Sequence, residues 1–161
     1  MKKNLVYLSL GSNLGDRLEH LQAAIGFLEE LGKIQKTSGV YETDPWGYED
    51  QPAFYNQVIL LETAYEPLEL LRYIKQVEQK MGRIPTFRYG PRVIDIDILL
   101  FDDIVFTTPE LTIPHPEMKN RAFVLAPLVE IDPLVSIPGE KAMAKELLEK
   151  IGMTGVRKIQ E

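Results

Sequence analysis

Residues 89–101 read YGPRVIDIDILLF and place two carboxylates, Asp95 and Asp97, at alternate positions of an apolar, β-branched run. Successive residues of a strand point to opposite faces, so both carboxylates project from the same face, with their Cα atoms about 7 Å apart. Two acids held together in an apolar strand repel each other and resist desolvation unless a cation lies between them. Arg83, Arg88 and Arg92 lie just upstream and suit an anionic ligand that would share such a cation. The segment therefore predicts a strand that carries a phosphate-handling metal site.

The chain before this strand alternates between two hydrophobic periods. The period of two predicts strands over residues 4–10, 34–42 and 53–62, and the period of 3.6 predicts helices over residues 14–31 and 67–81. Gly32 is expected to end the first helix. With the acidic strand, the order is β-α-β-β-α-β, which is typical of a ferredoxin-like fold with an antiparallel sheet and both helices on one side.

The chain after this strand predicts additions to the ferredoxin-like core. We expect a hairpin of residues 104–106 and 111–113, a helix over residues 121–131 that Pro127 splits or kinks, an extended stretch over residues 134–137, a last helix over residues 142–151, and a loose tail over residues 152–161. The fold class is therefore α+β, a ferredoxin-like βαββαβ core extended into three α/β/α layers. No linker or repeat divides the chain, so residues 1–161 are expected to form a single domain.

The composition narrows the kind of site and of partner. The chain has no cysteine and two histidines, which excludes thiolate ligands and disfavours a histidine-rich zinc site, so that oxygen ligands for Mg²⁺ or Mn²⁺ remain. A net charge of −6 argues against general binding of nucleic acid. No run is long enough to span a membrane, and Lys2 and Lys3 are not followed by the apolar core and cleavage site of a signal peptide. We expect a cytoplasmic monomer.

Three further features suggest ligand contacts, although each has a plain structural explanation. The Gly-Ser-Asn-Leu-Gly turn at residues 11–15 joins a strand to a helix and could hold a phosphate, but a helix cap explains it equally well. Phe54 and Asn56 share one strand face, which suits a flat heterocycle or ordinary core packing. His115 lies between two prolines and is either a ligand contact or a loop residue.

Taken together, these segments resemble the 6-hydroxymethyl-7,8-dihydropterin pyrophosphokinase family of folate biosynthesis. The shared segments are LSLGSNLGDR, YETDPWG, QPAFYNQV, VEQKMGR, RYGPRVIDIDILLF and LTIPHPEMKNRAFVLAPL, in this order over roughly the first 130 residues. GPR-x-x-D-x-D combined with PH-x-x-M-x-x-R-x-F is specific, whereas any one piece alone is not.

The resemblance implies an enzyme that transfers the β,γ-diphosphate of ATP to the hydroxymethyl group of the dihydropterin and releases AMP. It implies that Asp95 and Asp97 hold two Mg²⁺ ions and that Arg83 and Arg92 contact phosphate. The nucleotide contacts that it implies are Glu78, Arg88, Ile98, Thr112, His115 and Arg121. The pterin contacts are Thr43, Pro45, Trp46, Phe54, Asn56 and Phe123, with the ring sandwiched between the two phenylalanines.

The resemblance also bears on two loops and on four positions that depart from the family. The loops over residues 43–52 and 83–92 flank the acidic strand and are expected to close over the site as lids. Pro85, Tyr89, Glu110 and Pro116 depart from the best-known members of the family, all near the nucleotide or the second loop. From the residues alone, a D-x-D metal phosphohydrolase and a non-catalytic ferredoxin-like ligand-binding module remain alternatives.

Overall fold

The structure is a computed structural model that describes residues 3–44, 51–82 and 92–160. Its main sheet is antiparallel, with the strand order β5-β1-β4-β3-β8 and with β2 also paired to β4. The strands are β1 (Asn4–Ser12), β2 (Lys33–Thr37), β3 (Val40–Thr43), β4 (Phe54–Thr63), β5 (Asp95–Phe101) and β8 (Val156–Gln160). With β2 and β3 counted as one strand, β5-β1-β4-β3 is the ferredoxin-like order, and the predicted fold class is confirmed.

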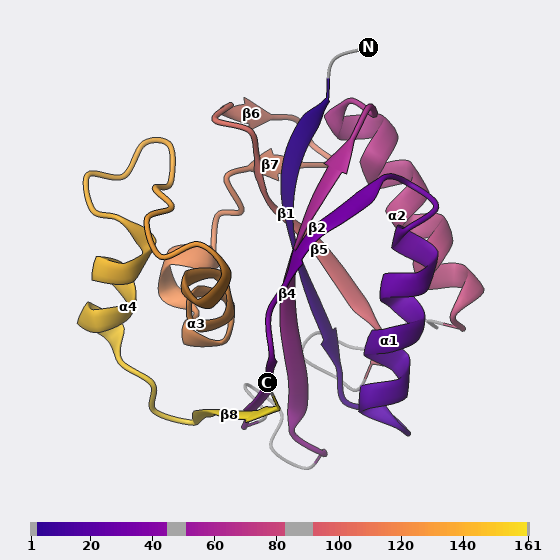
Figure 1. The fold of residues 1–161 in the computed structure, drawn as a ribbon, viewed down its shortest axis with the longest axis horizontal. Helices are drawn as coiled ribbons and strands as arrows, with labels where there is room; N and C mark the ends of the chain where they lie inside the picture. Colours follow the sequence, from indigo (N-terminus) through magenta and orange to yellow (C-terminus); the bar gives the residue numbers. More distant parts are fainter. Residues whose placement is uncertain (1–2, 45–50, 83–91, 161) are drawn as a thin grey trace.

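Helices cover both faces of this sheet (Figure 1). α1 (Arg17–Leu28) and α2 (Pro67–Lys80) lie on one face, and α3 (Ala122–Ile131) and α4 (Ala144–Ile151) lie on the other. The predicted hairpin is present as β6 (Phe106–Thr107) paired with β7 (Thr112–Ile113), and a short 3-10 helix, Met118–Asn120, leads into α3. No helix among the described residues is long and apolar enough to cross a membrane.

The alternation of apolar residues along the strands produces two cores, one on each face of the sheet. The first core joins the sheet to α1 and α2 and includes Leu8, Leu21, Ile59, Ile74 and Ile96. The second core joins the sheet to α3 and α4 and includes Val58, Leu99, Leu125, Leu128 and Ala144. Because β4 contributes to both cores, six consecutive residues of it are buried, as its apolar run predicts.

Two predictions about element boundaries are wrong, and of the predicted split or kink at Pro127 the split is absent. The predicted strand over residues 34–42 is interrupted at Ser38, whose Oγ takes the place of a backbone partner and accepts the N–H of Val58 (3.0 Å). Gly32 does not end α1, which stops at Leu28; a Cβ at residue 32 would lie 2.1 Å from the carbonyl oxygen of Glu62, so glycine is required for close approach to β4. α3 runs through Pro127 without a split.

The predicted loose tail is also a wrong prediction, since residues 156–160 form β8. This strand pairs with β3 and becomes the outermost strand on its side of the sheet. Side-chain contacts reinforce the pairing: Arg157 contacts Glu42, and Lys158 lies 3.3 Å from Glu130 of α3. A polar five-residue strand gives little hydrophobic signal, and its pairing depends on β3, more than a hundred residues away in the sequence.

Candidate active site

The two aspartates project from the face of β5 that α3 covers. Ile94, Ile96 and Ile98 pack into the first core with α1 and α2, so Asp95 and Asp97 between them face the opposite way. Asp95 lies opposite Gly11 of β1, and Gly11 lies opposite Asn56 of β4. The strand register thus brings the acidic pair and two of the predicted pterin contacts, Phe54 and Asn56, onto one face, with a glycine between them.

The environment of Asp97 disfavours its negative charge. Burial first, and then the charges of Asp95 and Glu78, raise the pKa of Asp97 from 3.8 to about 7, against opposing effects of Arg121 and Lys75. The Nη1 atom of Arg92 lies 3.6 Å from the Oδ1 atom of Asp95. Positive charge close to the pair would stabilise both carboxylates in their ionised form.

The donor set of this pair fits Mg²⁺. Both side chains offer carboxylate oxygens, which are hard ligands, and Mg²⁺ is commonly bound by one or two carboxylates together with substrate phosphates. Within the described part of the chain, no cluster of three or more His, Cys, Asp or Glu side chains could hold a metal ion. A divalent ion at Asp95 and Asp97 would take further ligands from water or from a bound phosphate, as Mg²⁺ usually does.

Glu78, predicted beside the nucleotide, supports the open edge of β5. Its carboxylate is 2% exposed and accepts the backbone N–H of Ile96 at 2.8 Å. It also lies 3.4 Å from the ammonium group of Lys75. Ile98 is buried in the first core, so only its main chain could contact a nucleotide. Both nucleotide assignments remain predictions.

A β-bulge positions His115. Leu8 pairs with Ile98 and Tyr7 pairs with Leu100, which leaves Leu99 as the extra residue, and its carbonyl accepts the N–H of His115 at 2.9 Å. The N–H of Glu117 donates to Nδ1 of the ring at 3.1 Å, so in the neutral form Nε2 carries the proton. Burial and the charge of Arg121 lower the pKa of His115, which favours that neutral form.

Asn56 and Phe54, two of the predicted pterin contacts, lie across Gly11 from the aspartates. Asn56 is buried, and its Nδ2 donates to Thr43 Oγ1 at 2.6 Å. A Cβ at residue 11 would lie 3.1 Å from Asn56 Oδ1 and 3.8 Å from the Phe54 ring, so the absent side chain leaves space in front of both. Phe123 lies in the first turn of α3, with the guanidinium of Arg121 5.5 Å from its ring centroid.

Asn13 is a structural residue of the site that the sequence did not single out. It is fully buried; its Oδ1 accepts the N–H of Arg92 (2.7 Å), and its own N–H donates to the Arg92 carbonyl (3.0 Å). Its Nδ2 donates to Gln51 Oε1 (2.7 Å) and to the Pro52 carbonyl (3.1 Å). The turn that holds Asn13 therefore fastens two other segments, which is the structural explanation of the Gly-Ser-Asn-Leu-Gly sequence. An asparagine directly after a strand was the available signal.

Several predicted residues cannot be placed. Arg83, Arg88, Pro45 and Trp46 lie outside the described residues, as do most of the two predicted lid loops and the family departures Pro85 and Tyr89. Thr112, in β7, and Arg121, at the N-terminus of α3, are partly exposed. The sandwich of a ring between Phe54 and Phe123 stays a prediction.

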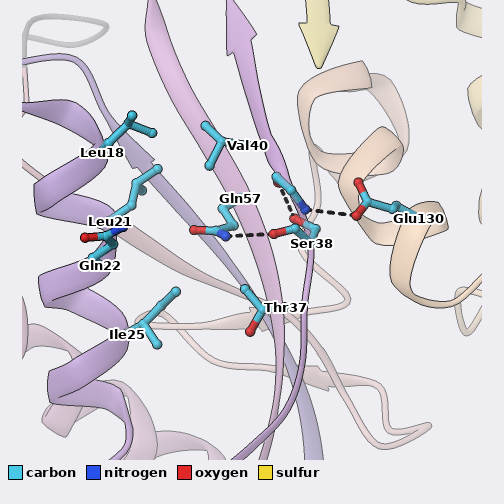
Figure 2. Close-up of a pocket in the computed structure, with 10 residues that line it drawn as sticks. Leu18, Leu21, Gln22, Ile25, Thr37, Ser38, Val40, Gln57 and Glu130 are labelled. Carbon is cyan, nitrogen blue, oxygen red and sulfur yellow. Dashed lines mark hydrogen bonds between the residues drawn. The ribbon is translucent and has the colours of Figure 1, made fainter. Parts of the chain in front are cut away.

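A separate cavity of about 410 Å³ lies between α1 and the junction of β2 and β3 (Figure 2). Leu18, Leu21 and Ile25 form its apolar wall. Two of its polar residues are already paired: Gln57 donates to the Ser38 carbonyl at 2.7 Å, and Glu130 accepts the N–H of Gly39 at 2.9 Å. Asp95, Asp97, Asn56 and His115 do not line it, so it is distinct from the candidate active site.

The fold and the site define a class of protein: a ferredoxin-like α+β protein with an acidic pair and a buried asparagine on one sheet face, separated by a glycine. The model of the 7,8-dihydro-6-hydroxymethylpterin-pyrophosphokinase (HPPK) family matches residues 7–133. The chain therefore belongs to this family, as its sequence resemblance predicts.

Individual relatives agree with this assignment. The chain is 48% identical to the 2-amino-4-hydroxy-6-hydroxymethyldihydropteridine pyrophosphokinase of Aquifex aeolicus, over 88% of each chain. It is 42% identical to the folic acid synthesis protein fol1 of Schizosaccharomyces pombe, over 97% of this chain and 22% of that protein. In structure it resembles the HPPK-DHPS of Plasmodium falciparum, with a TM-score of 0.79 at 21% identity, covering 98% of this chain and 45% of that one. The chain thus spans less than half the length of these last two proteins.

Proposed function

We propose that the chain transfers the β,γ-diphosphate of ATP to 6-hydroxymethyl-7,8-dihydropterin and releases AMP, with Asp95 and Asp97 as ligands of two Mg²⁺ ions. Pyrophosphoryl transfer in folate biosynthesis follows from the family. One observation supports the residue roles: the β5-β1-β4 register places the acidic pair and Asn56 on either side of Gly11. A metal-bound triphosphate and a heterocycle would therefore meet over Gly11.

On the nucleotide side, the residues act by placing positive charge and hydrogen-bond donors. Arg92, next to Asp95, and Arg121, whose charge opposes the rise in the pKa of Asp97 and helps to lower the pKa of His115, would face the triphosphate. Neutral His115 offers Nε2–H as a donor. Arg83 and Arg88 are proposed for the same role from the resemblance. Such transfer depends on in-line placement and charge neutralisation more than on a strong base.

On the pterin side, Asn56 reads the edge of the ring. Its Nδ2 is held by Thr43, and its Oδ1 lies against the space over Gly11, so Oδ1 would accept an N–H of the pterin. Phe54 and Phe123 would cover the two ring faces, and Pro45 and Trp46 would complete the pocket. Once the ring is fixed in this way, its hydroxymethyl group would point toward Asp95 and Asp97.

We assign no general base among the side chains. When bound, Mg²⁺ ions cancel charge on the triphosphate and lower the pKa of the attacking hydroxyl. Asp97 would accept a hydrogen bond from that hydroxyl. Its raised pKa describes the metal-free chain, and we expect the cations to keep it ionised during turnover.

The test is incubation with ATP, Mg²⁺ and 6-hydroxymethyl-7,8-dihydropterin, with the nucleotide products separated by chromatography. AMP formed in equal amount to the pterin diphosphate is expected. ADP or inorganic phosphate as the product would contradict the proposal. Phosphate release without pterin would favour a phosphohydrolase, and binding without turnover would favour a non-catalytic module.

We also propose that the chain acts as a cytoplasmic monomer. Most apolar residues of the described strands are buried in two cores within one chain, and the net charge of −6 favours solubility. Size-exclusion chromatography with light scattering should give a mass near 18.4 kDa. A dimer mass at micromolar concentration would contradict the monomer.

A further inference from the structure

We propose that Arg157 of β8 is a positioning residue for the pterin subsite, acting through Glu42, Thr43 and Asp44 at the end of β3. This inference rests on the proposed function, because it concerns the orientation of Asn56 toward a pterin. It assigns a role in the reaction to the C-terminal strand, which lies beyond the residues 7–133 that match the family.

β8 pairs with the outer edge of β3. Val156 lies opposite Thr43, and Arg157 lies opposite Glu42. The backbone N–H of Asp44 donates to the carbonyl of Gly155 at 3.0 Å, which continues the pairing beyond Thr43. The end of β3 is thus held along its outer edge by a strand that contributes no residue to the predicted pocket.

Arg157 adds side-chain hydrogen bonds to the residues on both sides of Thr43. Its Nε donates to Glu42 Oε1 at 2.7 Å, and its Nη2 donates to Asp44 Oδ1 at 3.2 Å. One planar guanidinium therefore binds the residues before and after Thr43, a geometry that the single ammonium of lysine cannot reproduce. The Arg157 and Asp44 side chains are half exposed or more, so their ion pair contributes little to stability, and its effect is on geometry.

Thr43 connects the end of β3 to Asn56 on the pterin side of the site. Its Oγ1 accepts the N–H of Asn56 Nδ2 at 2.6 Å and thereby decides which end of the amide faces the space over Gly11. Thr43 also pairs with Phe54 across the β3-β4 ladder. A displaced Thr43 would release the Asn56 amide to rotate, and the amide would then present a donor where the pterin requires an acceptor.

A second contact holds β8 in place without Arg157. Lys158 lies 3.3 Å from Glu130 of α3, and Glu130 also accepts the hydroxyl of Tyr41 (2.8 Å) and the N–H of Gly39 (2.9 Å). Figure 2 shows Glu130 reaching from α3 to the strand beside Ser38. This contact anchors β8 to α3 independently of Arg157, so removal of the guanidinium should not detach the strand.

The experiment compares R157Q, R157K and the exposed control R72Q on α2 with the unmodified chain. KM and kcat are measured with pterin varied at saturating ATP and with ATP varied at saturating pterin. R157Q should raise the pterin KM about three- to tenfold, the loss expected for one hydrogen bond of ordinary strength, with the ATP KM unchanged. R157K should show an intermediate pterin KM, and R72Q should change neither constant.

A second comparison tests the route through Thr43. In a T43V chain, which has no hydroxyl to hold Asn56, R157Q should raise the pterin KM no further, because both changes break the same chain of contacts. Additive effects, an unchanged pterin KM in R157Q, or equal rises in both KM values would overturn the inference. An unmodified chain that releases no AMP would overturn the proposed function and this inference together. Normal turnover with an unaffected R157Q overturns the inference alone.

Discussion

At the scale of single residues, the folded protein without metal disfavours the ionised form of Asp97. Its pKa is raised from 3.8 to about 7, mainly by burial and by Asp95. A group whose folded pKa lies above its unfolded value contributes most stability below the unfolded pKa, and this contribution is lost as the pH rises through the folded pKa. The metal-free protein should therefore lose stability between about pH 4 and pH 7 because of Asp97.

The first prediction is that D97N stabilises the metal-free protein while abolishing its activity. Asparagine cannot ionise, so the thermal midpoint in EDTA should rise at pH 8 and stay nearly unchanged at pH 4. Turnover should fall by several orders of magnitude because a metal ligand is lost. Differential scanning calorimetry at both pH values checks this, with D103N on the exposed turn as the control. A lower midpoint for D97N at pH 8 would contradict the prediction.

The second prediction concerns Gly11, which owes its importance to the side chain that it lacks. G11A places a methyl group 3.1 Å from Asn56 Oδ1, inside the space assigned to the pterin. Fitting one methyl group into an occupied space costs about 1–3 kcal/mol, so the pterin KM should rise about tenfold or more while the ATP KM stays the same.

The control for Gly11 is G26A, in α1, where nothing lies within 4 Å of an added Cβ. It should stabilise the helix by about 1 kcal/mol and leave both KM values unchanged. Steady-state kinetics and urea denaturation of the two variants separate the two effects. A G11A enzyme with an unchanged pterin KM would show that the pterin does not occupy the space over Gly11.

At the scale of elements, the third prediction concerns the turn after β1. N13A removes the side-chain hydrogen bonds that the fully buried Asn13 makes to Arg92, Gln51 and Pro52. The free energy of unfolding should fall by roughly 2–4 kcal/mol, and kcat should fall as well, because Arg92 is held by this residue.

N13D is the matched variant for this turn. It keeps the oxygen that accepts the Arg92 N–H but loses the donor to Gln51 and Pro52, so its Arg92-dependent activity should fall less than that of N13A. Urea denaturation and kcat measurements test both variants. An N13A protein as stable as the unmodified chain would show that the segments do not depend on this turn.

The elements that could be predicted from the sequence are those with a strong hydrophobic period. α2 was predicted closely because its apolar face recurs every three to four residues, and β5 because its apolar residues alternate with the aspartates. The break between β2 and β3 was not predicted, since it depends on Ser38 bonding to β4 rather than on periodicity. β8 was missed because its pairing is long-range.

At the scale of the whole molecule, the fourth prediction concerns metal removal. EDTA should abolish turnover without unfolding the chain, because the two cores are apolar and only Asp95 and Asp97 are assigned to the metal. Circular dichroism should be unchanged in EDTA, and excess Mg²⁺ should restore full activity. Loss of the folded spectrum in EDTA would mean that the metal has a structural role, contrary to this assignment.

The whole site was harder to predict than its parts. Asp95, Asn56 and His115 were each identified from their own segment, but their meeting on one face depends on the register of three strands and on the bulge at Leu99. Periodicity gives the face of each strand and not its alignment with its neighbours. The family resemblance supplied the alignment that the residues alone could not.

The bulge at Leu99 combines a requirement of packing with a requirement of the proposed reaction. Leu99 and Leu100 both pack into the second core and Phe101 into the first, so deleting Leu99 would leave every remaining side chain of β5 on its present face and would regularise the ladder with β1. The deletion would nevertheless remove a fully buried leucine from the second core, together with the carbonyl that holds the backbone of His115. Natural selection on this codon would therefore act through stability as well as through catalysis.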